Sequence, residues 1–241
     1  MSVQIVFVHG IRTSATMWRS QQAFLDTHGY AHSAVDLPGH GTRIAEDFTL
    51  HEALHTIDAA VRDAATRGPV LLVGHSMGGI LSLAYTGGGE ATPVAGLVAA
   101  SCTALPIGAG LAAYRWLARA MDSLPDRGRW LSDRVLDATI PPETRDDFGA
   151  GGYALDAQDI ALGSLSALDL AAAVARIRLP LWFINGQYDQ LRRHEALFCS
   201  LAPQAELIVV PRTTHLVTAM RPRVFNAVLQ LAIATLENES S

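Results

Sequence analysis

Short, continuous apolar runs recur along the chain and are typical of the buried strands of a parallel sheet. They cover Val3–Val8, Ala31–Leu37, Val70–Val73, Val94–Ser101, Leu179–Asn185 and Glu206–Val210. Segments with helical periodicity lie between most of them, namely Thr16–His28, Leu50–Arg67, Ile80–Tyr85, His194–Leu201 and Pro222–Leu236. Because strands that alternate with helices pair in parallel through right-handed crossovers, this pattern predicts an α/β fold with a mostly parallel sheet.

The alternation stops at about Thr103 and resumes after Arg176. The intervening sequence is mostly helix-like and is interrupted by prolines and glycines; its helical segments are Leu111–Met121, Trp130–Leu136 and Asp156–Leu168. We therefore predict a core made of residues 1–102 and 177–241, with a helical cap over residues 103–176 inserted between its two parts.

Composition narrows the class of protein. The chain has 241 residues, of which 49% are hydrophobic and 17% charged, so burying a sizeable core is no difficulty. A net charge of −5 gives no bulk attraction to nucleic acid or to an anionic membrane. No apolar run approaches the ~20 residues of a membrane span, and no signal-like segment opens the chain, so we expect a soluble cytoplasmic protein.

The two cysteines give no sign of metal or redox chemistry. Cys102 and Cys199 are far apart in the sequence and form no C-x-x-C pair. This spacing predicts small buried hydrophobic side chains and no metal site.

The most informative stretch follows the run Val70–Val73, which continues directly into Gly74-His75-Ser76-Met77-Gly78. A serine hydroxyl is a weak nucleophile until a neighbouring base takes its proton, and it must project from a tight strand-to-helix turn. Glycines two residues before and after the serine remove the Cβ atoms that would clash in such a turn. The alternative is an ordinary glycine-rich turn with a buried serine.

A base and an acid follow in the expected places. Asp189 comes one loop after the strand predicted at 179–185, and His215 comes one loop after the strand predicted at 206–210. Catalytic groups of an open parallel sheet belong in loops beyond the carboxyl ends of its strands. The order Ser76, Asp189, His215 is that of a nucleophile-elbow hydrolase, and Glu195 is the alternative acid.

Together these motifs resemble the α/β-hydrolase fold superfamily. The matching pieces are His9-Gly10, Asp36-Leu37-Pro38-Gly39-His40-Gly41, Gly74-His75-Ser76-Met77-Gly78-Gly79, Gly186-Gln187-Tyr188-Asp189 and His215. The resemblance implies about six strands in a three-layer fold, an oxyanion hole made by the backbone N–H groups of Ile11 and Met77, and a cap over the pocket. Dehalogenases and epoxide hydrolases of the superfamily carry aspartate at the nucleophile position, so Ser76 argues against both.

The motifs predict a cofactor-independent serine hydrolase that cleaves carboxylic esters of a small molecule. Thioester hydrolysis is the closest alternative, and perhydrolysis, C–C bond hydrolysis and lyase chemistry also occur on this fold with a serine triad. A ligand receptor with a residual triad is the alternative from another class. Monomer and dimer both stay open.

Some residues have two interpretations. Arg12 follows the predicted oxyanion donor, where it is either a solvated loop residue or a clamp for an anionic group of the substrate. Trp116 and Trp130 belong either to the helical core of the cap or to the substrate pocket. His9 and His75 are expected to be structural parts of their turns.

Overall fold

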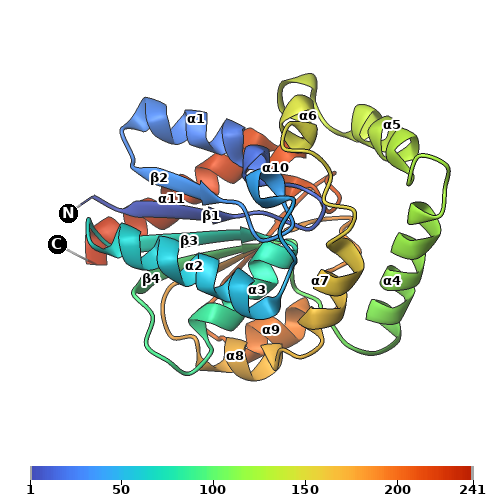
Figure 1. Ribbon diagram of the computed structural model, residues 1–241. Helices are drawn as coiled ribbons and strands as arrows, with labels where there is room; N and C mark the ends of the chain where they lie inside the picture. The colour runs from blue at the N-terminus through green and yellow to red at the C-terminus, as the bar shows by residue number, and fades with distance from the viewer. Residues whose placement is uncertain (1, 240–241) are drawn as a thin grey trace.

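The centre of the fold is a six-stranded parallel sheet with strand order β2-β1-β3-β4-β5-β6 (Figure 1). The computed structural model describes residues 2–239, except for the side chains of residues 109, 110, 113, 114 and 117. The strands are β1 Gln4–Val8, β2 His32–Val35, β3 Val70–His75, β4 Val94–Ala100, β5 Leu181–Gly186 and β6 Glu206–Val210. The six predicted strands are confirmed, with ends that differ by no more than two residues.

Helices cover both faces of the sheet. The α-helices are α1 Arg19–His28, α2 Leu50–Ala65, α3 Met77–Thr86, α4 Gly108–Asp122, α5 Arg129–Thr139, α6 Pro142–Gly149, α7 Gln158–Leu165, α8 Leu170–Arg176, α9 Glu195–Leu201, α10 Val217–Met220 and α11 Pro222–Glu239. Two short 3-10 helices, η1 Ala15–Trp18 and η2 Gly41–Arg43, complete the described structure.

The central strands are buried on both faces because their side chains alternate between two hydrophobic cores. On β3, Val70 and Leu72 belong to the core under α2, α3, α8 and α9. Leu71 and Val73 point to the other core, which α1 and α11 close. Figure 1 shows the resulting three layers, with the sheet between the two groups of helices.

The helix predictions were less accurate than the strand predictions. The segment predicted as one helix over Thr16–His28 is a 3-10 turn capped by the Ser14 hydroxyl, followed by α1. Helix α6 was missed because Pro141-Pro142 was interpreted as a break. Pro142 is instead the first residue of the helix, where a missing N–H does no harm. The four-residue helix α10 was also missed.

Helices α4 to α8 lie between β4 and β5, where the cap was predicted. Helix α8 packs on the core: Leu170 and Val174 are buried in the same cluster as α2 and α3. A Cβ on Gly87 at the end of α3 would lie 2.8 Å from the Ala173 Cα. We therefore propose that the cap ends before α8 and not at residue 176.

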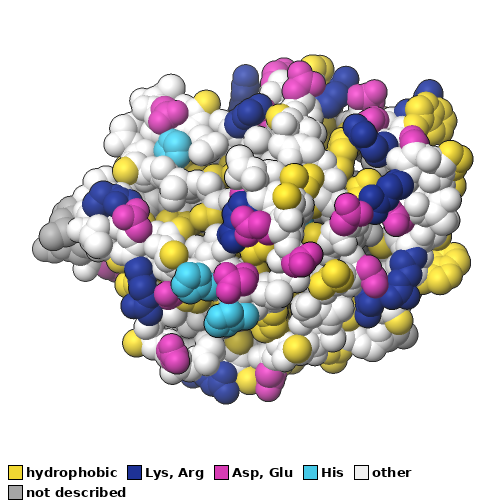
Figure 2. All heavy atoms as spheres, viewed as in Figure 1, with side chains coloured by type: hydrophobic (Ala, Val, Ile, Leu, Met, Phe, Trp, Pro, Cys, Tyr) yellow, Lys and Arg dark blue, Asp and Glu magenta, His cyan; other side chains and the backbone are white. Residues whose placement is uncertain are grey.

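Ion pairs connect the helices of the outer part of the cap. Helix α4 is joined to α7 by Arg115 and Arg119, which both bind the carboxylate of Asp159. These hydrogen bonds lower the pKa of Asp159 to about 2. Figure 2 shows hydrophobic side chains along the edge that α4 and α5 form, where Leu131 and Val135 are exposed. No single helix among the described residues is long and apolar enough to cross a membrane.

Candidate active site

The predicted site residues gather at the carboxyl ends of the strands. The strand order reverses at β1, which lies between β2 and β3, and open α/β sheets bind ligands in the crevice at such a point. Gly10 follows β1 and Ser76 follows β3, so the two loops lie on either side of this crevice. Asp189 and His215 follow β5 and β6.

Ser76 stands in a strained turn between β3 and α3. Its backbone has φ 54° and ψ −119°, which a non-glycine residue rarely adopts. The turn is closed so tightly that a Cβ on Gly74 would lie 2.5 Å from the carbonyl oxygen of Gly78. A Cβ on Gly78 would in turn lie 2.5 Å from the carbonyl oxygen of His9. The two glycines of the pentapeptide are therefore required by close backbone approach, as the sequence predicted.

Ser76, His215 and Asp189 form a continuous hydrogen-bonded chain. The Ser76 Oγ lies 2.8 Å from His215 Nε2, and His215 Nδ1 lies 3.1 Å from Asp189 Oδ1 and 3.2 Å from Oδ2. Because a carboxylate only accepts, Nδ1 carries the ring proton and Nε2 is left to accept from the serine hydroxyl. The structure thus brings together the three residues that were predicted to act as nucleophile, base and acid.

The acid is held in a buried, hydrogen-bonded position. Asp189 is only 6% exposed and also accepts from the N–H of Leu191 at 2.8 Å. Burial acts to raise its pKa, but the hydrogen bond and the charge of His215, together with further hydrogen bonds such as that from the Leu191 N–H, outweigh burial and hold the pKa of this carboxyl below its usual range. Asp189 therefore stays ionised where it can steady a protonated His215.

The alternative acid, Glu195, is engaged elsewhere. Its carboxylate accepts from Asn185 Nδ2 at 2.9 Å and from the Arg192 guanidinium at 2.6 and 2.9 Å. Asn185 also donates to the Thr103 hydroxyl at 2.8 Å, so this network ties the first residue of the predicted cap to the loop that carries Asp189.

The loop after β1 lies directly against the serine. A Cβ on Gly10 would be 3.3 Å from the Ser76 Cβ, so the next residue, Ile11, is close to the reacting group. Met77 is the first residue of α3, and first-turn N–H groups find no partner within their own helix. This placement is compatible with an oxyanion hole made by Ile11 and Met77, which stays a prediction.

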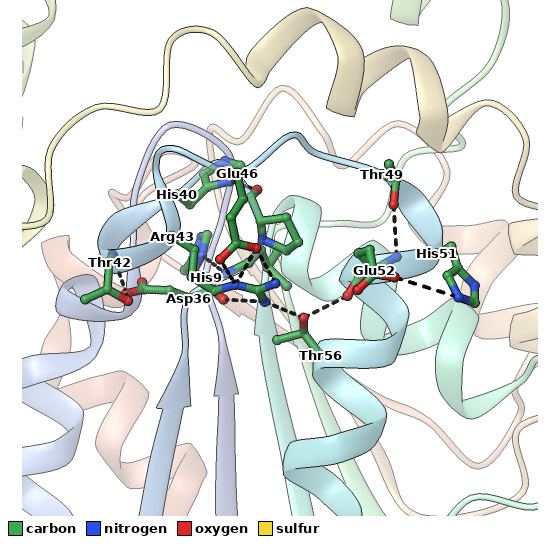
Figure 3. A network of polar contacts seen from close by, with 12 residues as sticks. His9, Asp36, His40, Thr42, Arg43, Glu46, Thr49, His51, Glu52 and Thr56 are labelled. Atoms are coloured by element: carbon green, nitrogen blue, oxygen red, sulfur yellow. Dashed lines mark hydrogen bonds and ion pairs between the residues drawn. The ribbon is translucent and has the colours of Figure 1, made fainter.

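Asp36 anchors this loop, and sequence reasoning did not assign it a role. Its Oδ1 accepts from the N–H of Ala15 at 2.7 Å, and its Oδ2 accepts from the N–H and hydroxyl of Thr42, both at 2.8 Å. Figure 3 shows this carboxylate near Arg43, whose guanidinium binds Thr56 of α2. The sequence feature that could have predicted this role is a single acidic residue at the end of an apolar strand, just before a turn.

His9 lies beneath the same loop, where it makes structural hydrogen bonds. Its Nδ1 donates to the Gly10 carbonyl at 2.7 Å, and its Nε2 accepts from the N–H of Leu37 at 3.0 Å. Burial, together with nearby His40, lowers the pKa of His9 to about 3. The ring is therefore neutral and structural at physiological pH.

Arg12 has a left-handed backbone conformation with φ of 63°, which is strained for a residue other than glycine. Burial raises the pKa of the Tyr153 phenol in the cap to about 12, and the positive charge of Arg12 acts against this rise. Arg12 is thus near this part of the cap.

The two cap tryptophans are largely exposed. Trp116 and Trp130 are 71% and 63% exposed, and the guanidinium of Arg134 lies 5.1 Å from the ring centroid of Trp130. This exposure argues against a place in the helical core of the cap, and the prediction that they contact the substrate stays a prediction. Helical periodicity indicated apolar positions but carried no information about what covers them.

A cavity of about 470 Å³ lies in the cap, with Leu136, Arg145 and Tyr153 in its wall and no member of the triad. Within residues 2–239, no three His, Cys, Asp or Glu side chains form a cluster suited to a metal ion.

Comparison with known proteins supports the fold. Residues 5–228 match the model of the Alpha/beta hydrolase family. One characterised relative is the (E)-2-((N-methylformamido)methylene)succinate hydrolase of Acinetobacter baylyi. It is 33% identical over 87 residues, which span 32% of this chain and 30% of the relative. The chain thus matches less than a third of the length of this relative.

Solved structures resemble the whole chain at low identity. A thermophilic esterase from Thermogutta terrifontis, solved with malate bound, has a TM-score of 0.77 at 19% identity, covering 98% of this chain and 91% of the esterase. An E-2-(acetamidomethylene)succinate hydrolase has a TM-score of 0.76 at 23% identity, covering 97% of this chain and 92% of that one. At these identities the likeness concerns the fold alone.

Proposed function

The chain belongs to the alpha/beta hydrolase family, and we propose that it is a serine hydrolase that cleaves carboxylic ester bonds of a small molecule. The observation that carries the proposal is the hydrogen-bonded chain from the Ser76 Oγ through His215 to the Asp189 carboxylate. A serine in a strained turn, with a base at 2.8 Å and an acid behind that base, is the arrangement that nucleophilic acyl transfer needs.

The proposed reaction has two halves. The Ser76 Oγ attacks the ester carbonyl while His215 Nε2 takes the hydroxyl proton, and the N–H groups of Ile11 and Met77 stabilise the oxyanion. His215 then gives this proton to the leaving alcohol, which leaves an acyl group on Ser76. A water molecule, deprotonated by His215, releases the acid and restores the serine. Every step uses residues of this chain and needs no cofactor.

The decisive experiment measures steady turnover of a p-nitrophenyl ester series of increasing acyl length, with matched oxygen esters and thioesters. We expect sustained turnover, labelling of Ser76 by a fluorophosphonate and no effect of EDTA. A ligand receptor with a residual triad would release at most one slow equivalent of p-nitrophenol. Inhibition by EDTA that zinc reverses would contradict the proposed chemistry. A preference for thioesters would select the thioesterase alternative.

We further propose that the substrate carries a free carboxylate, which Arg12 binds. Arg12 follows the proposed oxyanion donor Ile11, and its charge acts on Tyr153 of the cap, so it belongs to the oxyanion loop and is also near the cap. Two proteins that this chain resembles are named as hydrolases of succinate derivatives, which carry two carboxylates, and a third was solved with malate bound. An anionic substrate is consistent with all four observations.

Replacing Arg12 with glutamine is expected to abolish a preference for half-esters of dicarboxylic acids over their neutral amide analogues. A charge-assisted hydrogen bond is worth about 1.5–3 kcal/mol, which corresponds to roughly 10- to 150-fold in kcat/KM. Partial exposure of Arg12 places the effect toward the lower end. The measurement is the ratio of kcat/KM for the two analogues in wild type and in Arg12→Gln. An unchanged ratio would show that Arg12 does not bind the carboxylate.

A second candidate function is favoured by the names of two relatives. Both are named as hydrolases of succinates that carry an N-acylamino group, so the substrates in their names contain an amide-type nitrogen. The same triad would attack such a carbonyl, with the nitrogen as the leaving atom. Adding an N-acylaminomethylene succinate to the ester panel tests this candidate. A kcat/KM for this compound that is higher than that for the half-esters would support it.

A further inference from the structure

His75, the residue before the proposed nucleophile, makes a contact that the reaction above does not use. Its ring is 2% exposed, and its Nε2 lies 2.9 Å from the main-chain carbonyl oxygen of His215. The two imidazole rings are 5.1 Å apart between centroids. A residue of the β3 strand is thus bonded directly to the backbone of the loop that carries the proposed base.

The contact determines the protonation of the ring. A carbonyl oxygen accepts hydrogen bonds and does not donate them, so the His75 Nε2 must carry the proton. The other nitrogen, Nδ1, is then an acceptor, and it has no hydrogen-bond partner among the residues that the structure describes. Nδ1 faces Gly10, where a Cβ would lie 3.0 Å away.

A buried nitrogen without a partner is unfavourable, and native structures contain few of them. The unpartnered Nδ1 lowers stability at the position next to the proposed nucleophile. An aliphatic side chain there would leave no unpartnered nitrogen. Such an atom also occurs away from the site, at His32, so it is the position of His75 beside the nucleophile that gives it weight. What His75 has in exchange is the hydrogen bond from Nε2 to the His215 carbonyl.

His215 belongs to no regular element, and the hydrogen bonds that hold the start of its loop, such as that from the Tyr188 N–H to the Thr213 carbonyl at 2.8 Å, act on residues before it. His215 lies between the end of β6 at Val210 and the start of α10 at Val217. The next residue toward β6, Thr214, donates from its N–H and hydroxyl to the Sδ of Met220, and sulfur is a weak acceptor.

We propose that His75 is a positioning residue, whose Nε2–H holds the His215 carbonyl and thereby sets the distance between His215 Nε2 and the Ser76 Oγ. The inference rests on the proposed serine-hydrolase function. A misplacement of about 1 Å at the reacting groups lowers a rate by about 100-fold, so loss of this hydrogen bond acts on the chemical step. Since His75 is buried beneath the turn, substrate binding is unaffected.

The test compares three variants. His75→Phe keeps the ring and removes the donor, whereas His75→Gln keeps an N–H group that reaches the position of Nε2. His32→Phe is the control: His32 also has a buried Nδ1 without a described partner and a bonded Nε2, which contacts Asp26 at 3.0 Å, but it stands at the start of β2, an edge strand that carries no residue of the proposed triad. For each protein we would measure kcat, KM, the rate of fluorophosphonate labelling and the thermal midpoint.

His75→Phe is expected to lower kcat and the labelling rate by about 10- to 100-fold with KM unchanged within about twofold. Its thermal midpoint should move little, because the variant removes one unpartnered nitrogen and leaves one unpartnered carbonyl. His75→Gln should recover most of the lost kcat. His32→Phe should keep both rates.

Two outcomes would overturn the inference. One is a His75→Phe enzyme with wild-type kcat and labelling rate. The other is an equal loss of kcat in His75→Phe and His75→Gln accompanied by a lower thermal midpoint, which would indicate packing alone. Failure of the proposed function itself is recognised separately, because the wild-type protein would then neither turn over esters nor be labelled at Ser76.

Discussion

Ser76→Ala is expected to lower kcat for ester hydrolysis by at least about 10⁴ while the protein stays folded, and His215→Ala should do the same. The alanine at position 76 has no oxygen to attack the carbonyl, and the alanine at position 215 has no base to take the serine proton. Asp189→Asn should lower kcat somewhat less, because the base remains but its orienting carboxylate is lost. Steady-state kinetics with the p-nitrophenyl ester measure all three.

The double variant Ser76→Ala/His215→Ala provides the control. Nucleophile and base act as one unit, so we expect it to be about as slow as either single variant rather than slower by the product of the two effects. Circular dichroism and the thermal midpoint establish that each variant is folded. Retention of a tenth of wild-type activity by Ser76→Ala would contradict the assignment of the nucleophile.

Lowering the pH is expected to destabilise the fold already at pH values well above those at which carboxyl groups usually titrate. Burial lowers the pKa of both His9 and His75 from the ordinary 6.5 to about 3. Below pH 6.5 these histidines bind protons in the unfolded chain but not in the folded protein, so the free energy of unfolding falls as the pH falls toward 3. Between pH 7 and pH 5 each histidine contributes a loss of about 2 kcal/mol.

The charged and titratable groups near the two rings do not change the direction of this pH dependence. His40 and His75 repel a proton on His9, and His215 repels one on His75. Asp36 and Asp189 attract a proton, but burial has the larger effect in both cases. Together the two histidines account for about 4 kcal/mol, a large share of the 5–15 kcal/mol of a typical fold.

Urea unfolding at pH 7 and pH 5 measures this loss. His75→Phe is the matched variant, because phenylalanine does not titrate: its free energy of unfolding should fall by about 2 kcal/mol less over the same interval. Equal stability of the wild-type protein at pH 7 and pH 5 would contradict the burial argument.

The strands, and the proximity of Ser76, Asp189 and His215, could be predicted because each depends on a local pattern. A strand such as Val70–Val73 is buried on both faces and reads as an unbroken apolar run. Parallel strands place their carboxyl ends at one edge, so residues one loop after β3, β5 and β6 had to converge. The resemblance to a known superfamily added the expected oxyanion loop and the cap.

The features that could not be predicted from the sequence depend on contacts between segments that are distant in the chain. The hydrogen bonds from Asp36 to Ala15 and from His75 to the His215 carbonyl join residues whose proximity no periodicity reveals. Trp116 and Trp130 occupy helical positions that are usually covered, yet in this structure they are mostly exposed. Periodicity shows which face of a helix is apolar, whereas the neighbour that covers it is a property of the tertiary structure.

The pairing of β4 with β5 across residues 101–180 has a consequence for how the protein acquires activity during its synthesis. Closing so long a connection slows folding more than it lowers stability, because the entropy of loop closure grows only slowly with length. The serine turn is complete once β4 has been made, whereas the proposed acid and base follow β5 and β6. With the proposed function, a nascent chain therefore carries an inert serine until β6 has joined the sheet. Ester cleavage, once established, would report that all six strands of this sheet have formed.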